Sequence, residues 1–437
     1  MAIHYLKTAD KELEARATAD VTDTVKVMLA RIKAGGEAAA RDYAKRLDGW
    51  DGDIVVSEAA VAEAVRVVPQ ELKDDIAWAH DNIRRFAEAQ LATVSEMEVE
   101  LRPGLFAGQK LIPLHAAGAY VPGGRYAHIA SALMTITTAK VAGVGHITAC
   151  SPPKPGQGIH PAILYAMQLA GADHILALGG VQGIAAMAGG LFGAQPADIL
   201  IGPGNAFVAE AKRQMFGPVG IDMFAGPTDS MVIADAGAQA LRVAWDLVSQ
   251  AEHGHNSPVW LVSDSEALAR EVMRLVPELA AQLPQDNRHA AEAAWRDLGE
   301  VILCDTRAEM AEVANAYGPE HLHVQAQDLG WWRATLRSYG SLFLGAETTV
   351  SFGDKAAGPN HTLPTSGAAR YTGGLCVHKF LKTVTWQRVS AAGLPDLARV
   401  SANISRHEGM VGHARAAEIR LEAHRPATSQ KPRLAAG

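Results

Sequence analysis

HITACSPP, residues 146–153, is a short apolar run that stops at a serine and two prolines. The same form returns at HILALGG (174–180) and ADILIGPG (197–204). Helical patterns such as HPAILYAMQLAGA (160–172) and NAFVAEAKRQMF (205–216) lie between or after these runs. Strand–helix alternation of this kind predicts a parallel α/β sheet with loops at the carboxyl ends of its strands.

A second series of apolar runs begins at SMVIADA (230–236) and continues through SPVWLVSD (257–264), VILCD (301–305) and GSLFLG (340–345). The first hundred residues have mainly helical spacing, and the chain after Tyr371 is also expected to be helical. The sequence therefore predicts an α/β protein with two Rossmann-like parallel-sheet domains and helical extensions at both ends. The expected divisions are an N-terminal arm (1–18), one domain built from 19–118 and 230–370, a second domain (119–229) and a C-terminal extension (371–437).

Composition narrows the class of function. The chain has 437 residues, of which 48% are hydrophobic, and a net charge of −7 without a basic stripe. A small-molecule enzyme or binder is therefore favoured over a nucleic-acid partner. The three cysteines, Cys150, Cys304 and Cys376, are far apart, which favours a reducing compartment. The first residues lack an apolar signal region, and no apolar run reaches the roughly 18 residues of a membrane helix, so we expect a cytoplasmic protein.

Three loops have the composition of ligand-binding turns. GAYVPGGRYAH (118–128) precedes a helix, and LGGVQGIAA (178–186) and IGPGNAFV (201–208) each join a strand to a helix. Loops at strand ends and helix N-termini can hold a dinucleotide. The chain has no G-x-G-x-x-G fingerprint, however, and tight turns also require glycine and proline. These residues alone are consistent both with a dinucleotide site and with tight turns that have only a structural role.

Polar residues gather at the end of one predicted helix, in DLVSQAEHGHNSPVWLV (246–262). Gln250 and His253 are three residues apart and share a helix face. Zinc accepts imidazole nitrogen together with carboxylate or amide oxygen, although a polar helix end with a capping role explains the same pair. Two further stretches, FGDKAAGPNHTLPT (352–365) and HEGMVGH (407–413), offer more donors: Asp354, His361, Glu408 and His413.

A possible acid–base pair occurs in YGPEHLHV (317–324), where Glu320 directly precedes His321. Histidine titrates near neutral pH, so an acid beside it suits proton transfer. Adjacent glutamate and histidine residues are also common at positions that have no catalytic role. A thiol mechanism through Cys150 is an alternative, but no base is evident beside it, and a cysteine at a strand end usually serves packing.

Taken in order, these motifs resemble the histidinol dehydrogenases. The resemblance extends from about residue 20 to about 420 and is carried by YVPGG, GPGNAFVAEAKRQ, AGPT, SQAEHG, YGPEHL, FLG, AGPNHTLPT and FLKTVTWQ. It implies a zinc-dependent, NAD-linked enzyme that oxidises a primary alcohol twice, through an aldehyde, to a carboxylate. It also implies an intertwined homodimer in which C-terminal residues of one subunit complete the partner's site.

The resemblance assigns roles to individual positions, and it makes residues 119–229 the NAD-binding domain. The implied zinc ligands are Gln250, His253, Asp354 and His413. His321 is implied as the base that takes the alcohol proton, and Glu320 as the group that helps to activate water. His361 and Glu408 match substrate-contacting positions. The positions that match NAD contacts are Tyr120, Gln182 and Asn205.

Some residues depart from the usual family pattern. AGPTD stands where AGPSE is usual, which places Thr228 beside the substrate, and VHKFLK places Lys379 where acidic residues are typical. Arg125 and His128 follow YVPGG. Such basic groups favour an anionic alcohol, as in the branch of the family that oxidises 2,3-dihydroxypropane-1-sulfonate. Oxidation of histidinol, a cation, is the alternative. A non-catalytic binding protein built on the same fold is a third possibility. Loss of a zinc ligand or of the base would favour it, but all of these residues are present.

Overall fold

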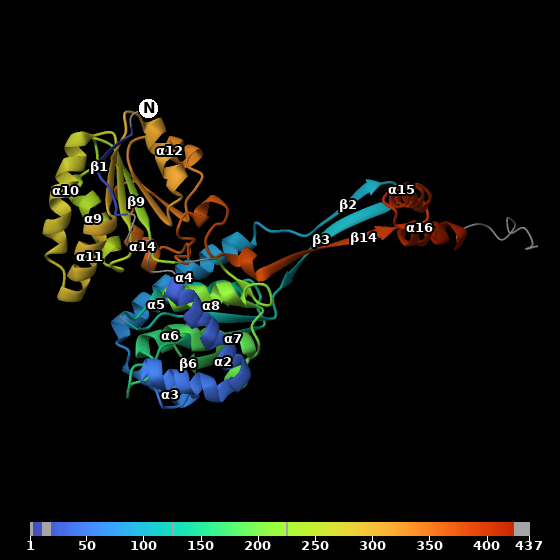
Figure 1. Cartoon of the computed structure of the whole chain (residues 1–437), viewed down its shortest axis with the longest axis horizontal. Helices are drawn as coiled ribbons and strands as arrows, with labels where there is room; N and C mark the ends of the chain where they lie inside the picture. Colours follow the sequence, from blue (N-terminus) through green and yellow to red (C-terminus); the bar gives the residue numbers. More distant parts are fainter. Residues whose placement is uncertain (1–2, 11–18, 125, 224–225, 424–437) are drawn as a thin grey trace, which may run out of the picture. The chain divides into compact units, whose positions relative to one another are not determined.

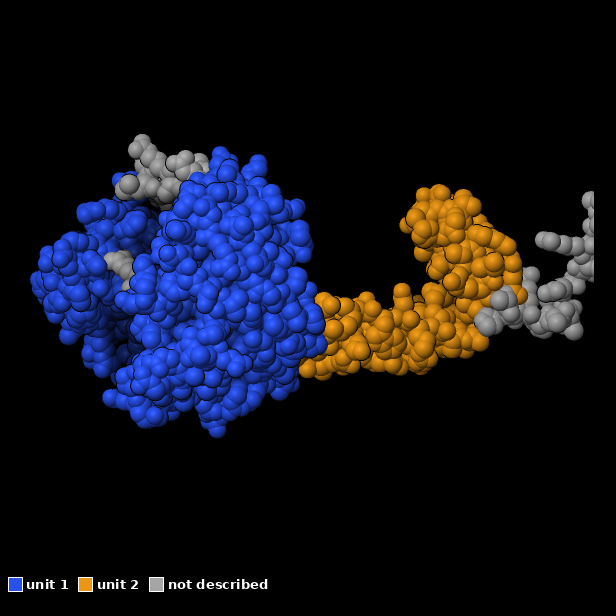
Figure 2. Space-filling view, turned by 90° about the horizontal axis from the view of Figure 1, so that it is seen from below, with its two compact units in different colours: residues 1–92, 113–380 blue, residues 93–112, 381–437 orange. Residues whose placement is uncertain are grey.

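The computed structural model describes residues 3–10, 19–124, 126–223 and 226–423. Contacts divide the chain into two compact units (Figure 2). The first unit contains residues 1–92 and 113–380, and the second contains residues 93–112 and 381–437. None of the helices in the described part of the chain is long and apolar enough to cross a membrane.

The first unit contains the parallel sheet that the opening motif predicts. Five strands follow the order β6-β5-β4-β7-β8, and every neighbouring pair is parallel. Their bounds are β4 Ala116–Tyr120, β5 His146–Ser151, β6 His174–Ala177, β7 Ile199–Ile201 and β8 Gly220–Ile221. The central strands are almost entirely buried, because helices cover both faces of the sheet.

Seven helices pack on this sheet (Figure 1). On one face, α2 packs with α7 and α8, where Ile32 joins the cluster of Val181 and Val208. On the other face, α3 and α4 pack with α5 and α6, and Ile83 joins the cluster of Leu133. The bounds are α2 Ala19–Tyr43, α3 Glu58–Val67, α4 Gln70–Leu91, α5 Ile129–Val141, α6 Pro161–Ala170, α7 Gly180–Gly189 and α8 Ala206–Met215.

This packing differs from the expected division of the chain. The sequence predicts that residues 19–118 belong to the domain of residues 230–370, but α2, α3 and α4 bury their apolar faces against the helices that cover the five-stranded sheet. Residues 93–112 belong to the second unit. Helical spacing identifies a buried face, but it does not say which sheet that face will cover.

The second sheet of the first unit has six strands in the order β1-β11-β10-β9-β12-β13. Its strands are parallel except for β1, which pairs antiparallel with β11, so part of the expected N-terminal arm is an edge strand. The strands are β1 His4–Lys7, β9 Ser230–Ala234, β10 Val259–Ser263, β11 Glu300–Leu303, β12 His321–Gln325 and β13 Ser341–Leu344.

Two helical layers cover this sheet (Figure 1). Residues of α9, α10 and α11 form one apolar cluster, and residues of α12 and α13 form another. The bounds are α9 Ala240–Ala251, α10 Glu266–Ala280, α11 Gln285–Leu298, α12 Arg307–Tyr317, α13 Leu329–Thr335 and α14 Val350–Lys355. The short α14 begins at Thr349, whose hydroxyl accepts from the backbone N–H of Ser351.

The second unit corrects the expectation of a purely helical C-terminal extension. It holds a three-stranded sheet of order β14-β3-β2 and two helices. The bounds are β2 Met97–Arg102, β3 Leu105–Pro113, β14 Leu381–Val389, α15 Leu394–His407 and α16 Val411–Ala423. The strand β14, LKTVTWQRV, is rich in the β-branched and aromatic residues that favour strands. Gly108 of β3 is required here, because a Cβ would lie 2.3 Å from the Trp386 ring.

A buried ion pair fixes the loop that follows β7. Lys212 of α8 pairs with Asp222, and both side chains are almost fully buried. The Lys212 ammonium donates to the carbonyl of Gly202 (2.9 Å), and Asp222 accepts from the Gly202 N–H (2.7 Å). Gly202 has a φ of 109°, and a Cβ there would lie 2.1 Å from the carbonyl oxygen of Tyr120. The pair therefore holds the loop 202–205 against the end of β4.

Candidate active site

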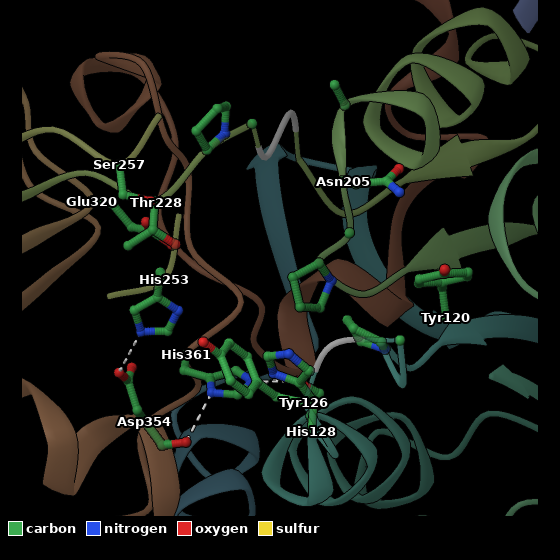
Figure 3. A pocket seen from close by; sticks show the side chains of 18 of the residues that line it. Tyr120, Tyr126, His128, Asn205, Thr228, His253, Ser257, Glu320, Asp354 and His361 are labelled. Carbon is green, nitrogen blue, oxygen red and sulfur yellow. Dashed lines mark hydrogen bonds and ion pairs between the residues drawn. The ribbon is translucent and has the colours of Figure 1, made fainter. Parts of the chain in front are cut away.

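A cavity of about 430 Å³ lies within the first unit, and residues from both of its parallel sheets line it. The five-stranded sheet contributes residues that follow its strands, including Tyr120 and Asn205. The six-stranded sheet contributes residues at the starts of its strands, namely Thr228 before β9, Ser257 before β10 and His321 in β12. Tyr120 and Asn205 face Thr228 and Ser257 across the pocket in Figure 3. Residues at the carboxyl ends of the strands therefore line the cavity in the five-stranded sheet, as the sequence predicts, whereas the six-stranded sheet contributes the starts of its strands.

The helix α9 brings two expected metal ligands to this amino edge. Gln250, in its last turn, is buried, and its Nε2 donates to Asp354 Oδ2 over 3.3 Å. His253 follows the helix, and its Nε2 lies 3.9 Å from the same oxygen. The Gln250 Oε1 is buried and has no hydrogen-bond partner among the described residues. An unpaired buried acceptor beside an imidazole and a carboxylate fits a bound cation.

The cluster is incomplete as a metal site within the described residues. Nowhere in that part of the chain do three or more His, Cys, Asp or Glu side chains come together as ligands. Here the first unit supplies one imidazole, one carboxylate and one amide, from His253, Asp354 and Gln250. The residues therefore suit a divalent cation that takes at least one further donor from elsewhere.

A second carboxylate, Asp246, braces the elements that carry these donors. It lies one turn before Gln250 on α9, and its Oδ1 accepts from the Thr349 hydroxyl that begins α14 (2.7 Å). Its Oδ2 accepts from Gln325 of β12 (2.6 Å) and lies 3.3 Å from His323 Nδ1. Asp246 thereby joins α9 to α14 and to β12. No motif in the sequence indicated this role.

Glu320 and His321 are buried at the start of β12. His321 Nδ1 lies 3.6 Å from Glu320 Oε2, and its Nε2 lies 3.4 Å from Asp354 Oδ1, but neither contact has hydrogen-bond geometry. Burial alone lowers the pKa of His321, but the carboxylates of Glu320 and Asp354 outweigh it and raise the pKa to about 9. Burial raises the pKa of Glu320 to about 8. Such shifts suit groups that exchange protons near neutral pH.

Asp229 positions this acid–base pair. Its Oδ1 accepts from the backbone N–H of Glu320 (2.6 Å), while Glu320 Oε2 accepts from the N–H of Asp229 (3.2 Å). The Asp229 Oδ2 accepts from the N–H of Ser366 (2.8 Å). The carboxylate that replaces the family's usual glutamate thus joins the start of β9 to the start of β12.

His361 lines the cavity, but both of its ring nitrogens are engaged. Nδ1 contacts the Asp354 carbonyl (2.9 Å) and Nε2 contacts the Ser131 hydroxyl (2.8 Å). A carbonyl only accepts, so Nδ1 carries the proton and Nε2 accepts from Ser131 when the ring is neutral. Burial lowers the pKa of His361 to about 4. The neutral ring therefore links the end of α14 to α5.

The basic groups of the cavity differ from those the sequence indicated. His128 lines it, but burial and then the charges of His361, His253 and Lys355 lower its pKa to about 4, so it is neutral at pH 7. Lys355, the last residue of α14, also lines the cavity. Lys355 was not among the cations that the sequence indicated, although it directly follows Asp354, an implied zinc ligand.

The side of the cavity formed by the five-stranded sheet offers polar groups to a ligand. The Tyr120 hydroxyl accepts from the Gly180 N–H (3.2 Å), which leaves its own proton to donate. Asn205 caps α8, accepting from two backbone N–H groups through Oδ1, so its amide nitrogen is left for a ligand. Gln182 does not line the cavity; it donates to Asp48 (2.8 Å), and its buried Oε1 has no partner among the described residues.

Five expected positions in the described part of the chain are not among the residues that line the cavity: Gln182, Gln250, Lys379, Glu408 and His413. Lys379 donates to the Thr372 hydroxyl instead (2.9 Å). Glu408 and His413 belong to the second unit, at the end of α15 and in α16. Arg125 lies outside the described residues. Cys150 is fully buried in β5, and burial raises the pKa of its thiol, which disfavours the thiol alternative.

Comparison with known proteins identifies the family. A family model described as histidinol dehydrogenase matches residues 11–421, which is nearly the whole chain. The chain belongs to the histidinol dehydrogenase family. Its fold agrees with a crystal structure of histidinol dehydrogenase from Elizabethkingia anophelis, with a TM-score of 0.87, 34% identity and 94% of each chain covered. The family consists of NAD-dependent dehydrogenases that act on CH–OH groups.

Within the histidinol dehydrogenase family, two relatives from Ruegeria pomeroyi are similar over nearly their full length. A protein named histidinol dehydrogenase homolog is 70% identical over 98% of this chain and 99% of its own. A sulfopropanediol 3-dehydrogenase is 59% identical over 98% of both chains. A histidinol dehydrogenase of Methanosarcina barkeri is 38% identical over 92% of each chain.

Proposed function

We propose that this protein oxidises the primary alcohol of 2,3-dihydroxypropane-1-sulfonate in two NAD-linked steps, through the aldehyde, to 3-sulfolactate. The observation that carries the proposal is the acid–base pair Glu320–His321 beside the donor cluster of Gln250, His253 and Asp354. Identity to the sulfopropanediol 3-dehydrogenase (59%) exceeds identity to a named histidinol dehydrogenase (38%), which supports an anionic alcohol. Oxidation of histidinol is the second candidate.

The chain's own residues account for the proton movements. His321 accepts the hydroxyl proton of the alcohol. Tyr120, Gln182 and Asn205 would hold NAD, which would take up a hydride from the reacting carbon in each of the two steps. In the second step Glu320 accepts a proton from the water that adds to the aldehyde. Gln250, His253 and Asp354 would hold a zinc ion, which would supply Lewis-acid chemistry at the alcohol oxygen. Thr228 and His128 contribute hydroxyl and imidazole groups to the substrate side of the cavity.

We also propose that the active protein is a homodimer in which Glu408 and His413 enter the cavity of a second copy of this chain. His413 would then be the fourth zinc ligand, and Glu408 would contact substrate. Exposed apolar side chains on the second unit support a partner surface, because such groups favour burial against another chain. They are Met97, Val99, Leu101, Ile404, Met410, Val411 and Ile419. The three free thiols fit the proposed cytoplasmic location.

The proposed reaction is tested by NADH formation with purified protein. Dihydroxypropanesulfonate is expected to give two NADH per alcohol, with a kcat/KM at least roughly 100-fold above that for histidinol. Both alcohols are supplied to the same zinc-loaded preparation, so metal content does not differ between them. A higher kcat/KM for histidinol would overturn the sulfonate assignment and leave the family assignment intact.

The base is tested by His321→Asn, which keeps a polar side chain of similar size but removes the titrating ring. Turnover is expected to fall by roughly 100-fold or more, while substrate still binds. The kcat/KM of the unmodified enzyme should rise with pH, because His321 accepts a proton only when neutral. The variant should lack this rising limb.

Glu320→Gln separates the two half-reactions. With Glu320 assigned to water activation, the variant should lose more rate with the aldehyde supplied directly than with the alcohol. Single-turnover NADH formation from each compound measures both losses. Equal losses in the two half-reactions would contradict separate roles for Glu320 and His321.

A further inference from the structure

The cavity wall carries one unpaired positive charge. Among the described residues that line it, Lys355 is the only lysine or arginine. No hydrogen bond or ion pair joins its ammonium to another described residue. Lys355 is the last residue of α14, directly after Asp354, and it is exposed at the wall of this cavity.

The neighbouring carboxylate does not neutralise this charge. Asp354 is turned toward other groups: Oδ2 accepts from Gln250 (3.3 Å) and lies 3.9 Å from His253, and Oδ1 lies 3.4 Å from His321. Lys355 lines the same cavity as His128, His253 and His361. A positive charge close to three imidazoles and without a carboxylate partner favours an anionic ligand.

Other candidates for this role are weaker. His128 is neutral at pH 7 because its pKa is lowered to about 4, so it offers only a neutral N–H. Lys379 is bonded to Thr372 and is not among the lining residues. Among the described residues that line the cavity, no second lysine or arginine accompanies Lys355.

We propose that Lys355 binds the anionic group of the substrate and is the residue that selects a short alcohol ending in a tetrahedral oxyanion, such as a sulfonate. This inference rests on the proposed oxidation at His321. Lys355 and His321 line the same cavity, so one small substrate can present its oxyanion to the ammonium and its hydroxyl to the base. A cationic alcohol such as histidinol is repelled by the same ammonium.

Lys355→Met tests the proposal, since it removes the charge and keeps an unbranched side chain. The kcat/KM for dihydroxypropanesulfonate should fall by about 10–150-fold, the range for one hydrogen bond to a charged group. The loss should lie mainly in KM, because the oxyanion is bound equally in the ground and transition states. The neutral analogue 1,2-propanediol should change by less than about threefold, the scatter expected for a surface substitution. Glycerol 3-phosphate in parallel shows whether phosphate is accepted as well as sulfonate.

Two further variants complete the design. Lys355→Arg keeps a charge and should retain part of the sulfonate activity. Lys379→Met makes the same chemical change at the lysine that the sequence alone indicated, and no selective loss is expected there. An equal loss for the sulfonate and for propanediol with Lys355→Met, or a sulfonate-selective loss with Lys379→Met, would overturn the assignment of Lys355.

Binding of the sulfonate without turnover separates this inference from the proposed reaction. Calorimetry measures the affinity of dihydroxypropanesulfonate for the unmodified protein and for Lys355→Met, with zinc content checked in both. Weaker binding to the variant supports Lys355 even if no NADH is formed, in which case the proposed reaction alone fails. Equal affinity for the two proteins would contradict the role of Lys355 whatever the turnover.

Discussion

His253→Ala is expected to remove the bound metal and to lower turnover by about 1000-fold or more. His253 and Gln250 are presented by the end of α9 toward Asp354, and the buried Gln250 Oε1 lacks a partner among the described residues. A Lewis acid stabilises a developing alkoxide by several kcal/mol, and about 4 kcal/mol corresponds to about 1000-fold in rate. Metal analysis after dialysis and steady-state NADH formation measure the two effects.

His321→Asn is the matched control for this prediction. Both variants lose an imidazole from the same cavity, but only His253 is assigned to the metal. His321→Asn should therefore retain zinc although it turns over slowly. A His253→Ala protein that keeps a full complement of zinc, or full activity in a metal-free preparation, would contradict the assigned ligand set.

Mixed dimers test whether His413 completes the site of a second subunit. His413→Ala alone should also lose zinc and activity. When the His253→Ala and His413→Ala proteins are refolded together, random assembly makes half of the dimers mixed, and one site in each mixed dimer has all its ligands. About a quarter of the unmodified activity is then expected. No recovery despite mixed-dimer formation would show that both ligands act within one chain.

Lys212→Met is expected to lower the free energy of unfolding by about 3–5 kcal/mol, because it leaves the buried Asp222 carboxylate without its partner charge. Both side chains of the Lys212–Asp222 pair are almost fully buried. The same change also frees the Gly202 carbonyl, which Lys212 binds at 2.9 Å. Urea unfolding followed by circular dichroism gives the change in free energy.

Arg213→Met provides the control one residue along α8. Arg213 pairs with Glu210 at 2.6 Å, but its side chain is 52% exposed, so the cost of its loss should be below about 1 kcal/mol. The double change Lys212→Met with Asp222→Leu should cost less than the two single changes added together, since it removes both buried charges. A loss at Lys212 no larger than that at Arg213 would contradict a stabilising role for the buried pair.

The sequence by itself determined the class of the fold. Runs such as HITACSPP and SMVIADA have short apolar centres and are separated by segments of helical spacing, and the two mainly parallel sheets follow from that pattern. Ordered motifs also determined the family and pointed to His253, His321 and Asp354, which the structure brings to one cavity. These inferences succeed because strand and helix periods, and the chemistry of each side chain, are local properties of the chain.

Only the tertiary structure decided how these parts combine. The apolar faces of α2, α3 and α4 are visible in the sequence, but the helices against which they pack lie elsewhere in the chain and are not indicated by these faces. The strand β14 needs β3 as its partner, and Gly108 makes room for Trp386 there. Periodicity describes one segment at a time, whereas packing is a relation between two segments.

The electrostatics of the cavity were likewise decided by the tertiary structure. The sequence indicated Arg125, His128 and Lys379 as cations, yet His128 is neutral at pH 7, Lys379 is bonded elsewhere and Lys355 lines the cavity. The charge of a side chain depends on its burial and on the groups that face it, and both arise only when distant segments meet. The residue types were fixed by the sequence, but the charges that a substrate meets were fixed by the fold.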